Sequence, residues 1–498
     1  MVENTKLKSV SHENTFAKDV LRMASAPLCT QILGIILMPV ITRLYLPDVY
    51  GTFQIFASIV MPIAVFAGLG YSSSIVLPQK DEVAANMLFV SLMFTVLITL
   101  LSILFIYWGS GPLLEWLKAP ELEAYLWVIP VNVLAHGLYL SLRSWNVRNR
   151  SFSRIAISRI SDAAVNKGVL IGAGLCGFAT SGSLIAGRLA GSLTMSSVLG
   201  AQIWQKNAEL FKHSIRWHGM VQGIKRYRKF PMYNLWVGLI SRLATTIIVF
   251  SLSFYFTKTA AGYYGLGLAV LSLPMTFIAG SIGEVFYQKS ARAKHDGTNA
   301  SLVTNLFKRM VYLGMLPFLL LAVAGEDFFA FVFGANWSDA GVFAQILSFR
   351  IFIDFAITPA RILTNILEKQ EITLILHIVI IVISSVSIVI GGLADNVYLA
   401  LGLFSFLNGL ATLGFGLLMF RFIGISSSTV FGMLSKCFVL CLPIIIVTAL
   451  AKLIFNASPL SLIVISVISC VIYYGLLLKN DKVLQSAVIE IFNKMKQA

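Results

Sequence analysis

The stretch from Trp204 to Lys229, WQKNAELFKHSIRWHGMVQGIKRYRK, is the longest polar interruption in an otherwise apolar chain. It carries seven Lys and Arg side chains against one acid, Glu209. Charges at this density are too costly to place in hydrocarbon, so the stretch is predicted to be a loop or a surface helix on one side of a membrane. It separates two apolar halves of comparable length.

The composition predicts a polytopic membrane protein. Hydrophobic residues make up 57% of the 498 residues and charged residues only 12%, whereas soluble domains have about 25% charged residues. The net charge of +16 is explained by the excess of Lys and Arg in cytoplasmic loops, so no nucleic-acid partner is expected. The five cysteines lie in apolar stretches without a C-x2-C pair, which predicts neither a disulfide nor a metal site.

Fourteen stretches are apolar enough and long enough to cross a bilayer, which needs about 20 residues per span. All are predicted to be helices, because a chain in lipid must satisfy its own backbone hydrogen bonds. The first 24 residues are polar and of mixed charge, so no secretory signal peptide is expected. The predicted spans are 25–46, 50–77, 84–108, 122–145, 154–177, 179–203, 230–256, 260–288, 306–334, 338–360, 371–393, 395–420, 434–454 and 460–478.

The distribution of positive charge supports this count. With the N-terminus in the cytoplasm, 29 of the 38 Lys and Arg residues fall in cytoplasmic segments, four fall outside and five lie within spans. The bias predicts fourteen helices with both termini in the cytoplasm. The outside connections are short, which argues against a glycan polymerase or ligase that works through a large external domain.

Catalytic motifs are absent, so the chain is not expected to be an enzyme. Its one G-x-G-x-x-G, at Gly172, Gly174 and Gly177, lies inside an apolar span instead of following a strand. Without an ATP site or another cofactor, transport would be driven by an ion gradient or by the substrate gradient. The pair Gly187-x-x-x-Gly191 predicts close packing of helices.

Charged residues within the spans are the informative ones, because each costs at least about 2.5–3.5 kcal/mol to insert unless it faces protein or water. Four of the cations fall near the middle of their spans, two in each half of the chain. This predicts a cavity that is cationic at its centre and suits an anionic cargo such as a phosphate. The cations are Arg159, Lys167, Arg188, Arg242 and Arg350, and the acids counted with them are Asp162, Glu284 and Asp354.

These residues fall on polar stripes at helical spacing. Span 5 aligns Arg159, Asp162 and Asn166. Span 6 aligns Ser181, Arg188, Ser192 and Ser196. Span 7 aligns Asn234, Gly238, Ser241 and Thr245 beside Arg242, and span 10 aligns Arg350, Asp354, Thr358, Arg361 and Asn365.

Two interpretations remain open for some of these charges. Arg159 with Asp162, and Arg350 with Asp354, have the spacing of helix neighbours and would neutralise each other as structural pairs. Arg43 ends the first span and either anchors the helix at the interface or adds to the cavity. Lys167 and Arg188 have no obvious partner in the sequence.

Five strings, taken in order, resemble the polysaccharide flippase (Wzx-like) branch of the multidrug/oligosaccharidyl-lipid/polysaccharide exporter superfamily. They lie between residues 30 and 340, and their order and spacing are more specific than any one of them. They are Pro39-Val-Ile-Thr-Arg43-Leu-Tyr-Leu-Pro47-Asp-Val-Tyr50-Gly51, Arg148-Asn-Arg150-Ser-Phe, Arg226-Tyr-Arg-Lys-Phe230-Pro231, Ala261-Gly262-Tyr-Tyr-Gly265-Leu-Gly-Leu-Ala with Leu273-Pro274, and Phe333-Gly334-Ala-Asn-Trp337.

The resemblance implies an all-α fold of two pseudo-symmetric six-helix lobes around a central cavity, with two extra C-terminal helices. On this division residues 1–24 are a cytoplasmic segment, 25–203 the first lobe, 204–229 the basic loop, 230–422 the second lobe, 423–479 the extra helices and 480–498 a cytoplasmic tail. The implied activity is alternating-access flipping of undecaprenyl-pyrophosphate-linked oligosaccharide across the bacterial cytoplasmic membrane, for O-antigen, capsule or exopolysaccharide assembly. A polymerase and a chain-length regulator of the same pathway would be partners.

The predicted substrate-binding residues are Arg43, Arg159, Lys167, Arg188, Arg242 and Arg350. Asp162, Glu284 and Asp354 are candidates for binding a coupling proton or sodium ion. A lipid II-type flippase and a cation-coupled drug exporter of the same superfamily are the alternatives, with a glycan polymerase less favoured. In lipid II flippases the two extra helices form a lipid-binding groove.

Overall fold

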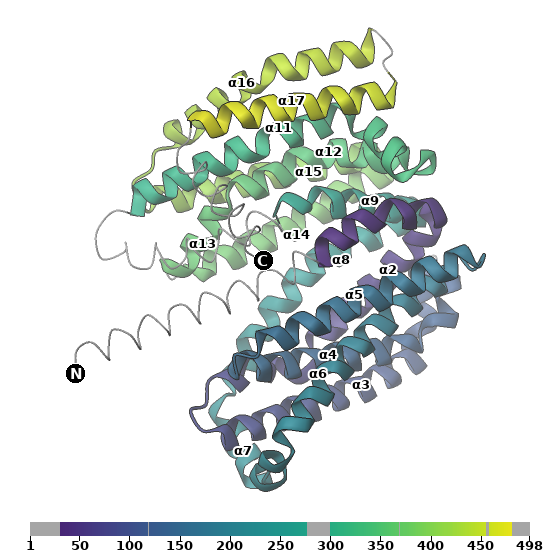
Figure 1. Cartoon of the computed structure of the whole chain (residues 1–498), viewed down its shortest axis with the longest axis vertical. Helices are drawn as coiled ribbons and strands as arrows, with labels where there is room; N and C mark the ends of the chain where they lie inside the picture. Colours follow the sequence, from purple (N-terminus) through teal and green to yellow (C-terminus); the bar gives the residue numbers. More distant parts are fainter. Residues whose placement is uncertain (1–29, 118, 276–298, 368, 455–457, 481–498) are drawn as a thin grey trace. The chain divides into compact units, whose positions relative to one another are not determined.

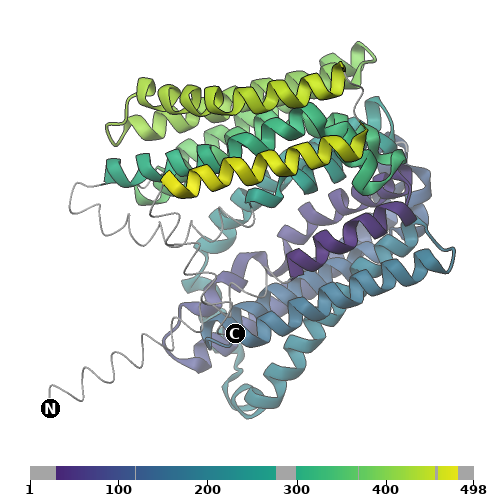
Figure 2. The ribbon, with the colours of Figure 1, turned by 45° about the horizontal axis from the view of Figure 1, so that its top comes forward.

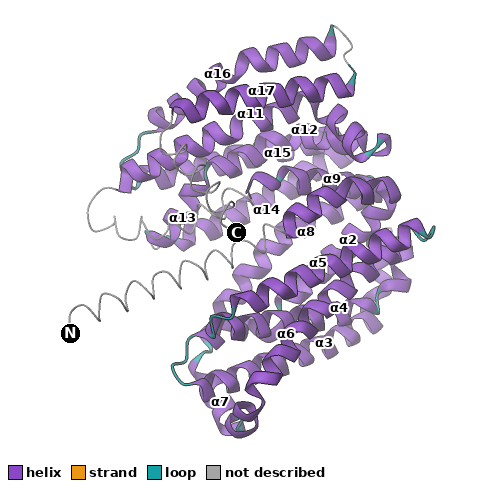
Figure 3. Cartoon of the chain, viewed as in Figure 1, coloured by secondary structure: helices purple, strands orange, loops and turns teal. Residues whose placement is uncertain are grey.

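A computed structural model describes residues 30–117, 119–275, 299–367, 369–454 and 458–480. Every secondary-structure element within these residues is helical (Figure 3), which confirms the all-α prediction. Nine of the described helices are long and apolar enough to cross a membrane, and the bent pair α12–α13 would make a tenth. The chain is therefore polytopic, while the number fourteen and the sides of the termini stay predictions.

Each of the fourteen predicted spans coincides with a described helix over at least part of its length. Residues 276–298, which include the second half of span 8, lie outside the described residues. The helices are Thr30–Leu44, α2 (Pro47–Val65), α3 (Asp81–Leu117), α4 (Val128–Arg148), α5 (Phe152–Leu175), α6 (Ser181–Ser214), α7 (Trp217–Arg226), α8 (Leu235–Tyr255), α9 (Lys258–Leu271), α11 (Asn299–Phe333), α12 (Ser338–Ala356), α13 (Thr358–Ile366), α14 (Gln370–Leu393), α15 (Val397–Arg421), α16 (Ser427–Leu453) and α17 (Pro459–Asn480) (Figure 1). Short 3-10 or π turns lie at η1 (Ala67–Val76), η2 (Pro120–Tyr125), η3 (Phe230–Asn234) and η5 (Ala335–Trp337).

The chain forms two compact units. The N-terminal unit comprises residues 1–265 with 377–400, and the C-terminal unit comprises 266–376 with 401–498. In the N-terminal unit α8 is tied to α2, because the Thr246 hydroxyl donates to the Ser58 carbonyl at 3.2 Å. In the C-terminal unit α16 and α17, the yellow-green and yellow helices of Figure 2, pack against α11. The lobe boundaries given above stay predictions.

The basic stretch 204–229 is largely helical. α6 continues to Ser214, and α7 follows after a two-residue break. The buried Asn86 of α3 stabilises the break between α6 and α7. Its side-chain N–H donates to the Ser214 carbonyl at 2.8 Å, and its side-chain oxygen accepts from the Arg216 backbone N–H at 3.0 Å. Gly219 and Gly223 let α7 lie directly on α3, since a side chain there would meet Asn86 and Met87. The predicted surface helix is present, with its cations exposed.

Two of the strings that carry the family resemblance meet in space. A side chain at Gly51 would collide with the Lys258 backbone, and one at Gly262 would collide with the Pro47 carbonyl. The starts of α2 and α9 therefore pack backbone to backbone, which only glycine allows. These strings mark a joint between helices that are far apart in the sequence.

Further contacts of the first string, and those of the second and fifth strings, also lie at joints between helices. Tyr45, which is buried, donates its hydroxyl to the Leu170 carbonyl at 2.9 Å and so ties the end of the first helix to α5. Arg148 pairs with Asp81 at 2.7 Å, which links the end of α4 to the start of α3. Gly334, at φ 103°, makes the turn between α11 and α12. The resemblance in these strings is thus a resemblance in how the helices are joined.

Candidate functional site

The close contact between α5 and α6 positions the polar residues of the N-terminal unit. A Cβ at Gly187 would lie 3.2 Å from the Asn166 carbonyl oxygen, and one at Gly191 would collide with the Asp162 carboxylate. The G-x-x-x-G pair therefore brings the polar stripe of α5 against α6, which confirms the predicted packing seam.

Among the described residues, Asp162 is the one acid that interacts with Arg159, Lys167 and Arg188. Arg188, Lys167 and Arg159 all interact with it electrostatically, and Arg188 and Lys167 act on each other as well. Nevertheless, no ion pair within 4 Å joins Asp162, Lys167 or Arg188 to another side chain in the described parts of the chain. The buried Oδ1 of Asp162 accepts no hydrogen bond from those parts either. The positive charges are close to the carboxylate without being paired to it.

Arg159 differs from the other cations of this group. Its Nε donates to the Tyr139 hydroxyl at 3.2 Å, which ties α5 to α4. The predicted structural pair between Arg159 and Asp162 is therefore absent as a direct ion pair, although the two charges interact at longer range.

His136 on α4 is a member of the site that sequence reasoning missed. Arg188 of α6 and Arg242 of α8 both interact electrostatically with its imidazole. It lines a small cavity of about 40 Å³ between α2, α4 and α6. The available signal was the spacing of Asn132 and His136, two polar residues one helical turn apart within an apolar span. The lining is Phe53, Phe56, Ala57, Val60, Met61 and Ala64 of α2, Asn132 and His136 of α4, and Arg188 and Ser192 of α6.

The polar stripe predicted on α6 faces protein, as expected. The Ser181 hydroxyl donates to the Val49 carbonyl of α2 at 3.2 Å, and the Ser196 hydroxyl donates to the Ala135 carbonyl of α4 at 2.7 Å. Arg188 and Ser192 lie between them and line the cavity. One face of α6 thus carries both the helix-to-helix hydrogen bonds and the cation.

The remaining predicted residues lie elsewhere or are undescribed. Arg242 is exposed on α8 and makes no ion pair with the described residues. Arg43 is exposed in the last turn of the first helix. Glu284 falls within 276–298, outside the described residues, and Arg350 belongs to the C-terminal unit.

In the C-terminal unit the predicted site residues Arg350 and Asp354 belong to a cluster of paired charges. Asp354, which is buried, lies 2.6 Å from Arg361 and 3.8 Å from Arg350. The Arg350 guanidinium also stacks over the Phe404 ring, 4.8 Å from its centroid. The predicted pairing of Arg350 with Asp354 is present, but Arg361 is the closer partner.

The predicted single stripe along span 10 is wrong as a feature of one straight helix. α12 ends at Ala356, and α13 leaves it at 48° after Ile357. Pro359, near the start of α13, has no backbone N–H and so cannot continue the backbone hydrogen bonds of α12. The Asp354–Arg361 pair spans this bend.

The acids named within spans in the sequence prediction omit two that lie in the predicted span 306–334. Glu326 and Asp327 lie in α11 just beyond a kink at Ala324. Lys452 of α16 pairs with both, at 3.6 Å and 2.7 Å. These two ion pairs connect α16 to α11 within the C-terminal unit.

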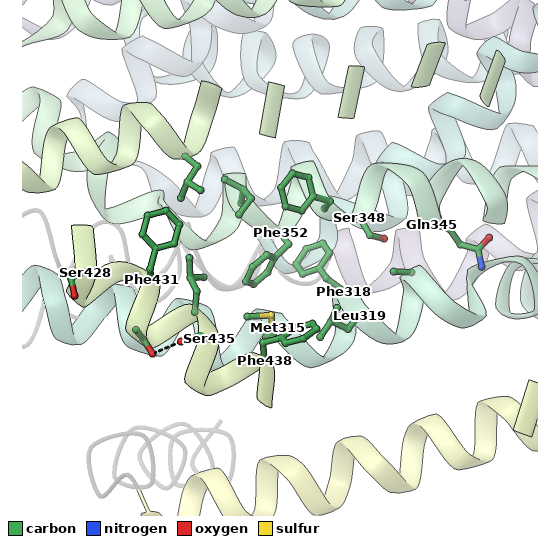
Figure 4. A pocket seen from close by; sticks show the side chains of 16 residues that line it. Met315, Phe318, Leu319, Gln345, Ser348, Phe352, Ser428, Phe431, Ser435 and Phe438 are labelled. Atoms are coloured by element: carbon green, nitrogen blue, oxygen red, sulfur yellow. Dashed lines mark hydrogen bonds between the residues drawn. The ribbon is translucent and has the colours of Figure 1, made fainter. Parts of the chain in front are cut away.

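An apolar groove of about 790 Å³ lies in the same unit (Figure 4). Phe318 of α11 and Phe352 of α12 face Phe431 and Phe438 of α16 across it. Its few polar groups include Ser348. A volume in the range of typical ligand pockets and a lining this apolar suit a hydrocarbon chain.

Comparison with known proteins places the chain in a family. Residues 40–342, more than half of the chain, match the family described as "Polysaccharide biosynthesis protein". The chain belongs to this polysaccharide biosynthesis protein family. The succinoglycan biosynthesis transport protein ExoT of Rhizobium meliloti (strain 1021) is 24% identical over 331 residues, which are 62% of this chain and 60% of ExoT. The match thus spans less than two thirds of the length of ExoT.

Solved structures share the fold of this polysaccharide biosynthesis protein. The lipid II flippase MurJ in an inward closed conformation has a TM-score of 0.71 at 13% identity, covering 92% of this chain and 99% of MurJ. The P26A mutant of a MATE protein has a TM-score of 0.51 at 13% identity, covering 84% and 96%. The fold that the resemblance implies is therefore confirmed, and the nine or ten apolar helices among the described residues support a multi-pass membrane protein.

Proposed function

We propose that this protein is a flippase that moves undecaprenyl-pyrophosphate-linked oligosaccharide units from the cytoplasmic to the outer leaflet of the bacterial inner membrane by alternating access. The observation that carries the proposal is a set of cations without an ion pair among the described residues, Lys167, Arg188 and Arg242, in a membrane protein of a polysaccharide biosynthesis family. Membership of that family, a relative named as a succinoglycan transport protein and a fold shared with a lipid II flippase support it.

The physical argument concerns uncompensated charge. A cation inside a membrane protein is costly unless an anion or water meets it. Arg188 and Lys167 interact with Asp162 without contacting it, so these two cations and Arg159 share one carboxylate among the described residues. A pyrophosphate supplies the missing negative charge, and guanidinium groups are strong partners for phosphate oxygens.

The lipid tail needs a different environment from the head group. The groove between α11, α12 and α16 offers an apolar wall that includes five phenylalanines, Phe318, Phe349, Phe352, Phe431 and Phe438. In the proposal the tail lies in this groove or in the bilayer while the head group crosses at the cations.

Ion coupling is assigned to the span acids. We propose Asp162 before Asp354 as the coupling residue, because the buried Asp162 Oδ1 has no hydrogen bond from the described residues, whereas the Asp354 carboxylate is paired with two arginines. Glu284 stays a prediction. Transport that is unchanged when proton and sodium gradients are collapsed would remove the coupling proposal.

The direct test is charge reversal in cells. Arg188→Glu and Arg242→Glu are expected to abolish surface polysaccharide and to accumulate single repeat units on the cytoplasmic side, at normal protein level. Lys206→Glu, at an exposed cation of α6 without an ion pair in the described residues, is the matched control and should leave polysaccharide normal. Normal polysaccharide in both arginine variants would contradict the proposal. A single unit displayed outside the cell would indicate a polymerase instead.

A further inference from the structure

The part of α11 that lines the apolar groove, residues 315–322, is bounded by two irregularities of the helix. We call this part the wall segment. Pro317 has no backbone N–H, so the Leu313 carbonyl, four residues before it, loses its helical hydrogen bond. At the other end Ala324 has φ −113° and ψ 16°, which are not helical. The backbone of α11 therefore does not fix the wall segment by itself.

A side chain of another helix meets the carbonyl that Pro317 leaves without a helical donor. The Tyr474 hydroxyl of α17 donates to the Leu313 carbonyl at 2.7 Å. Within a bilayer a backbone carbonyl without a donor is costly, because no water can replace the missing N–H. Tyr474 thus supplies the hydrogen bond that the proline removes from α11.

The second irregularity is also met from another helix. The Gln345 side-chain N–H of α12 donates to the Val323 carbonyl, next to Ala324, at 3.0 Å. Gln345 itself lines the groove (Figure 4). A Cβ at Gly325 would lie 2.8 Å from the Gln345 side chain, so α11 and α12 approach closely here. Each end of the wall segment is therefore held by a side chain from a different helix.

Tyr473, the neighbour of Tyr474, makes a similar bond with a different consequence. Its hydroxyl donates to the Tyr312 carbonyl at 2.8 Å and lies 3.5 Å from the Cys437 Sγ. The residue four positions after Tyr312 is Leu316, which has a backbone N–H to donate within the helix. Of the two acceptors, the Leu313 carbonyl is thus the one that depends on its tyrosine.

We infer that Tyr474 and Gln345 are positioning residues of the groove, which hold the wall segment in the shape that accepts a hydrocarbon chain. The inference rests on the proposed function for the identity of that chain, and it deepens the proposal by identifying what shapes the site of the lipid tail. Dispersion contacts are lost when facing atoms separate by as little as about 0.5–1 Å, so a displaced wall binds a chain poorly. Although α17 adds no residue to the lining among the described parts of the chain, it controls the groove through Tyr474.

The test is photoaffinity labelling of the purified full-length protein in nanodiscs of phosphatidylethanolamine and phosphatidylglycerol. The probe is undecaprenol carrying a diazirine, which has the hydrocarbon chain but no phosphate. Label that excess undecaprenol competes away is located by mass spectrometry. Tyr474→Phe keeps the ring and removes the hydroxyl, and should reduce labelling of the wall segment about tenfold, as expected when an acceptor is left unpaired. Tyr473→Phe is the matched control and should lose no more than about twofold, because its acceptor keeps a helical donor.

Two further variants separate positioning from a general loss of stability. Pro317→Ala supplies the missing N–H to the Leu313 carbonyl, so adding Tyr474→Phe to it should cost no more labelling than Tyr473→Phe costs in the wild type. Gln345→Met keeps a similar size, removes the N–H donor and makes the lining more apolar. A positioning role predicts weaker labelling in Gln345→Met, whereas a role in lining alone predicts stronger labelling.

Five outcomes would overturn the inference. They are wild-type labelling in Tyr474→Phe, equal losses in Tyr474→Phe and Tyr473→Phe, an undiminished effect of Tyr474→Phe in the Pro317→Ala protein, stronger labelling in Gln345→Met, and no competed label in the groove of the wild-type protein. Elution as a single species on size exclusion shows that each variant is folded. If Tyr474→Phe does not fold alone, the Pro317→Ala pair and Gln345→Met decide.

The result is independent of the cation test. Equal labelling in all variants would remove the positioning roles and leave the flippase proposal standing, since the tail can also lie in the bilayer. The expected losses of label, together with normal surface polysaccharide in Arg188→Glu and Arg242→Glu, would support the positioning roles and contradict the flippase proposal.

Discussion

The two units of this protein each place arginines around one aspartate, and they do so differently. In the C-terminal unit Asp354 lies 2.6 Å and 3.8 Å from two guanidinium groups, and its charge is neutralised in place. In the N-terminal unit Asp162 interacts with Arg159, Lys167 and Arg188 but pairs within 4 Å with none of them, nor with any other described residue.

The difference indicates that the pairing of each charge with an opposite charge, and not the number of charges, distinguishes a structural cluster from the proposed binding site. A buried ion pair stabilises only when the geometry satisfies both partners, and the bend between α12 and α13 supplies that geometry by placing Arg361 against Asp354. The α5–α6 seam brings charges together without pairing them. On the proposed function, the N-terminal cations without an ion pair among the described residues meet an anionic head group, whereas the C-terminal cluster stabilises the bend between α12 and α13.

The largest expected effect is on the stability of the C-terminal cluster. Asp354→Asn removes the shared partner of Arg350 and Arg361, and breaking a buried pair in this way costs roughly 3–5 kcal/mol of unfolding free energy. We expect the lower end, because the Arg361 side chain is 42% exposed. Denaturant unfolding of the purified protein in detergent measures the change.

Asp162→Asn is the matched variant for that comparison. Because Asp162 makes neither an ion pair nor an Oδ1 hydrogen bond with the described residues, its unfolding free energy should change by less than about 1 kcal/mol, within the usual range for changes that remove no such contact. Equal losses in the two variants would show that the clusters are alike and would remove the distinction drawn here.

The packing seam gives the next largest effect. Gly191→Leu places a side chain where the Asp162 carboxylate lies, so α5 and α6 must separate. Overpacking of this kind costs about 1–3 kcal/mol and should also weaken pyrophosphate binding. Gly172→Leu on α5 is the control, since a Cβ there meets nothing within 4 Å; the same loss in both would mean that the seam does not position the cluster.

Removal of the one acid should strengthen anion binding. Two charges about 10 Å apart in an effective dielectric near 20 interact by roughly 1.7 kcal/mol, so Asp162→Asn is expected to bind pyrophosphate about tenfold more tightly or somewhat more. The same variant should transport less if Asp162 couples an ion. Calorimetric titration measures the affinity, and a weaker affinity in Asp162→Asn would contradict the view that its charge opposes the ligand.

The smallest effect concerns an ion pair outside the membrane spans. Glu121 in η2 pairs with Lys258 at the start of α9. Burial raises the pKa of Glu121, but the hydrogen bond and the charge of Lys258 outweigh it and hold the pKa below its ordinary value of 4.5. A lowered acid pKa stabilises the fold above pH 4.5, and the contribution is lost as pH falls through the lowered pKa.

Because both side chains are about one third exposed or more, Lys258→Gln should cost only about 0.2–1 kcal/mol at pH 7. Wild type and variant should converge in unfolding free energy at acid pH. A difference that persists below the lowered pKa would show that Lys258 acts through packing and not through charge.

The sequence alone determined the membrane character, the helical class, the family resemblance and the span charges Arg159, Asp162, Lys167 and Arg188, but not His136. The resemblance follows from five short strings, and the other conclusions follow from composition and from spacing within one helix. An apolar run of about 20 residues must form a helix in lipid, because only a helix satisfies its backbone hydrogen bonds within the segment. Gly187-x-x-x-Gly191 likewise predicts a close contact with a neighbouring helix. The polar stripe of α6 was likewise visible, because i, i+4 spacing fixes which side chains share a face.

Only the tertiary structure decided which of the described span charges are paired and which have no ion pair among the described residues. Arg350 and Asp354 could be paired from their spacing, but the closer partner, Arg361, reaches Asp354 across a bend that a straight-helix stripe does not contain. Arg159 had the same kind of spacing with Asp162 and is instead bonded to Tyr139 of another helix. His136 carried no signal beyond one polar neighbour, because its significance comes from Arg188 and Arg242 on helices distant in the sequence. Compensation of charge depends on distances between helices, and these are set by packing and not by spacing along the chain.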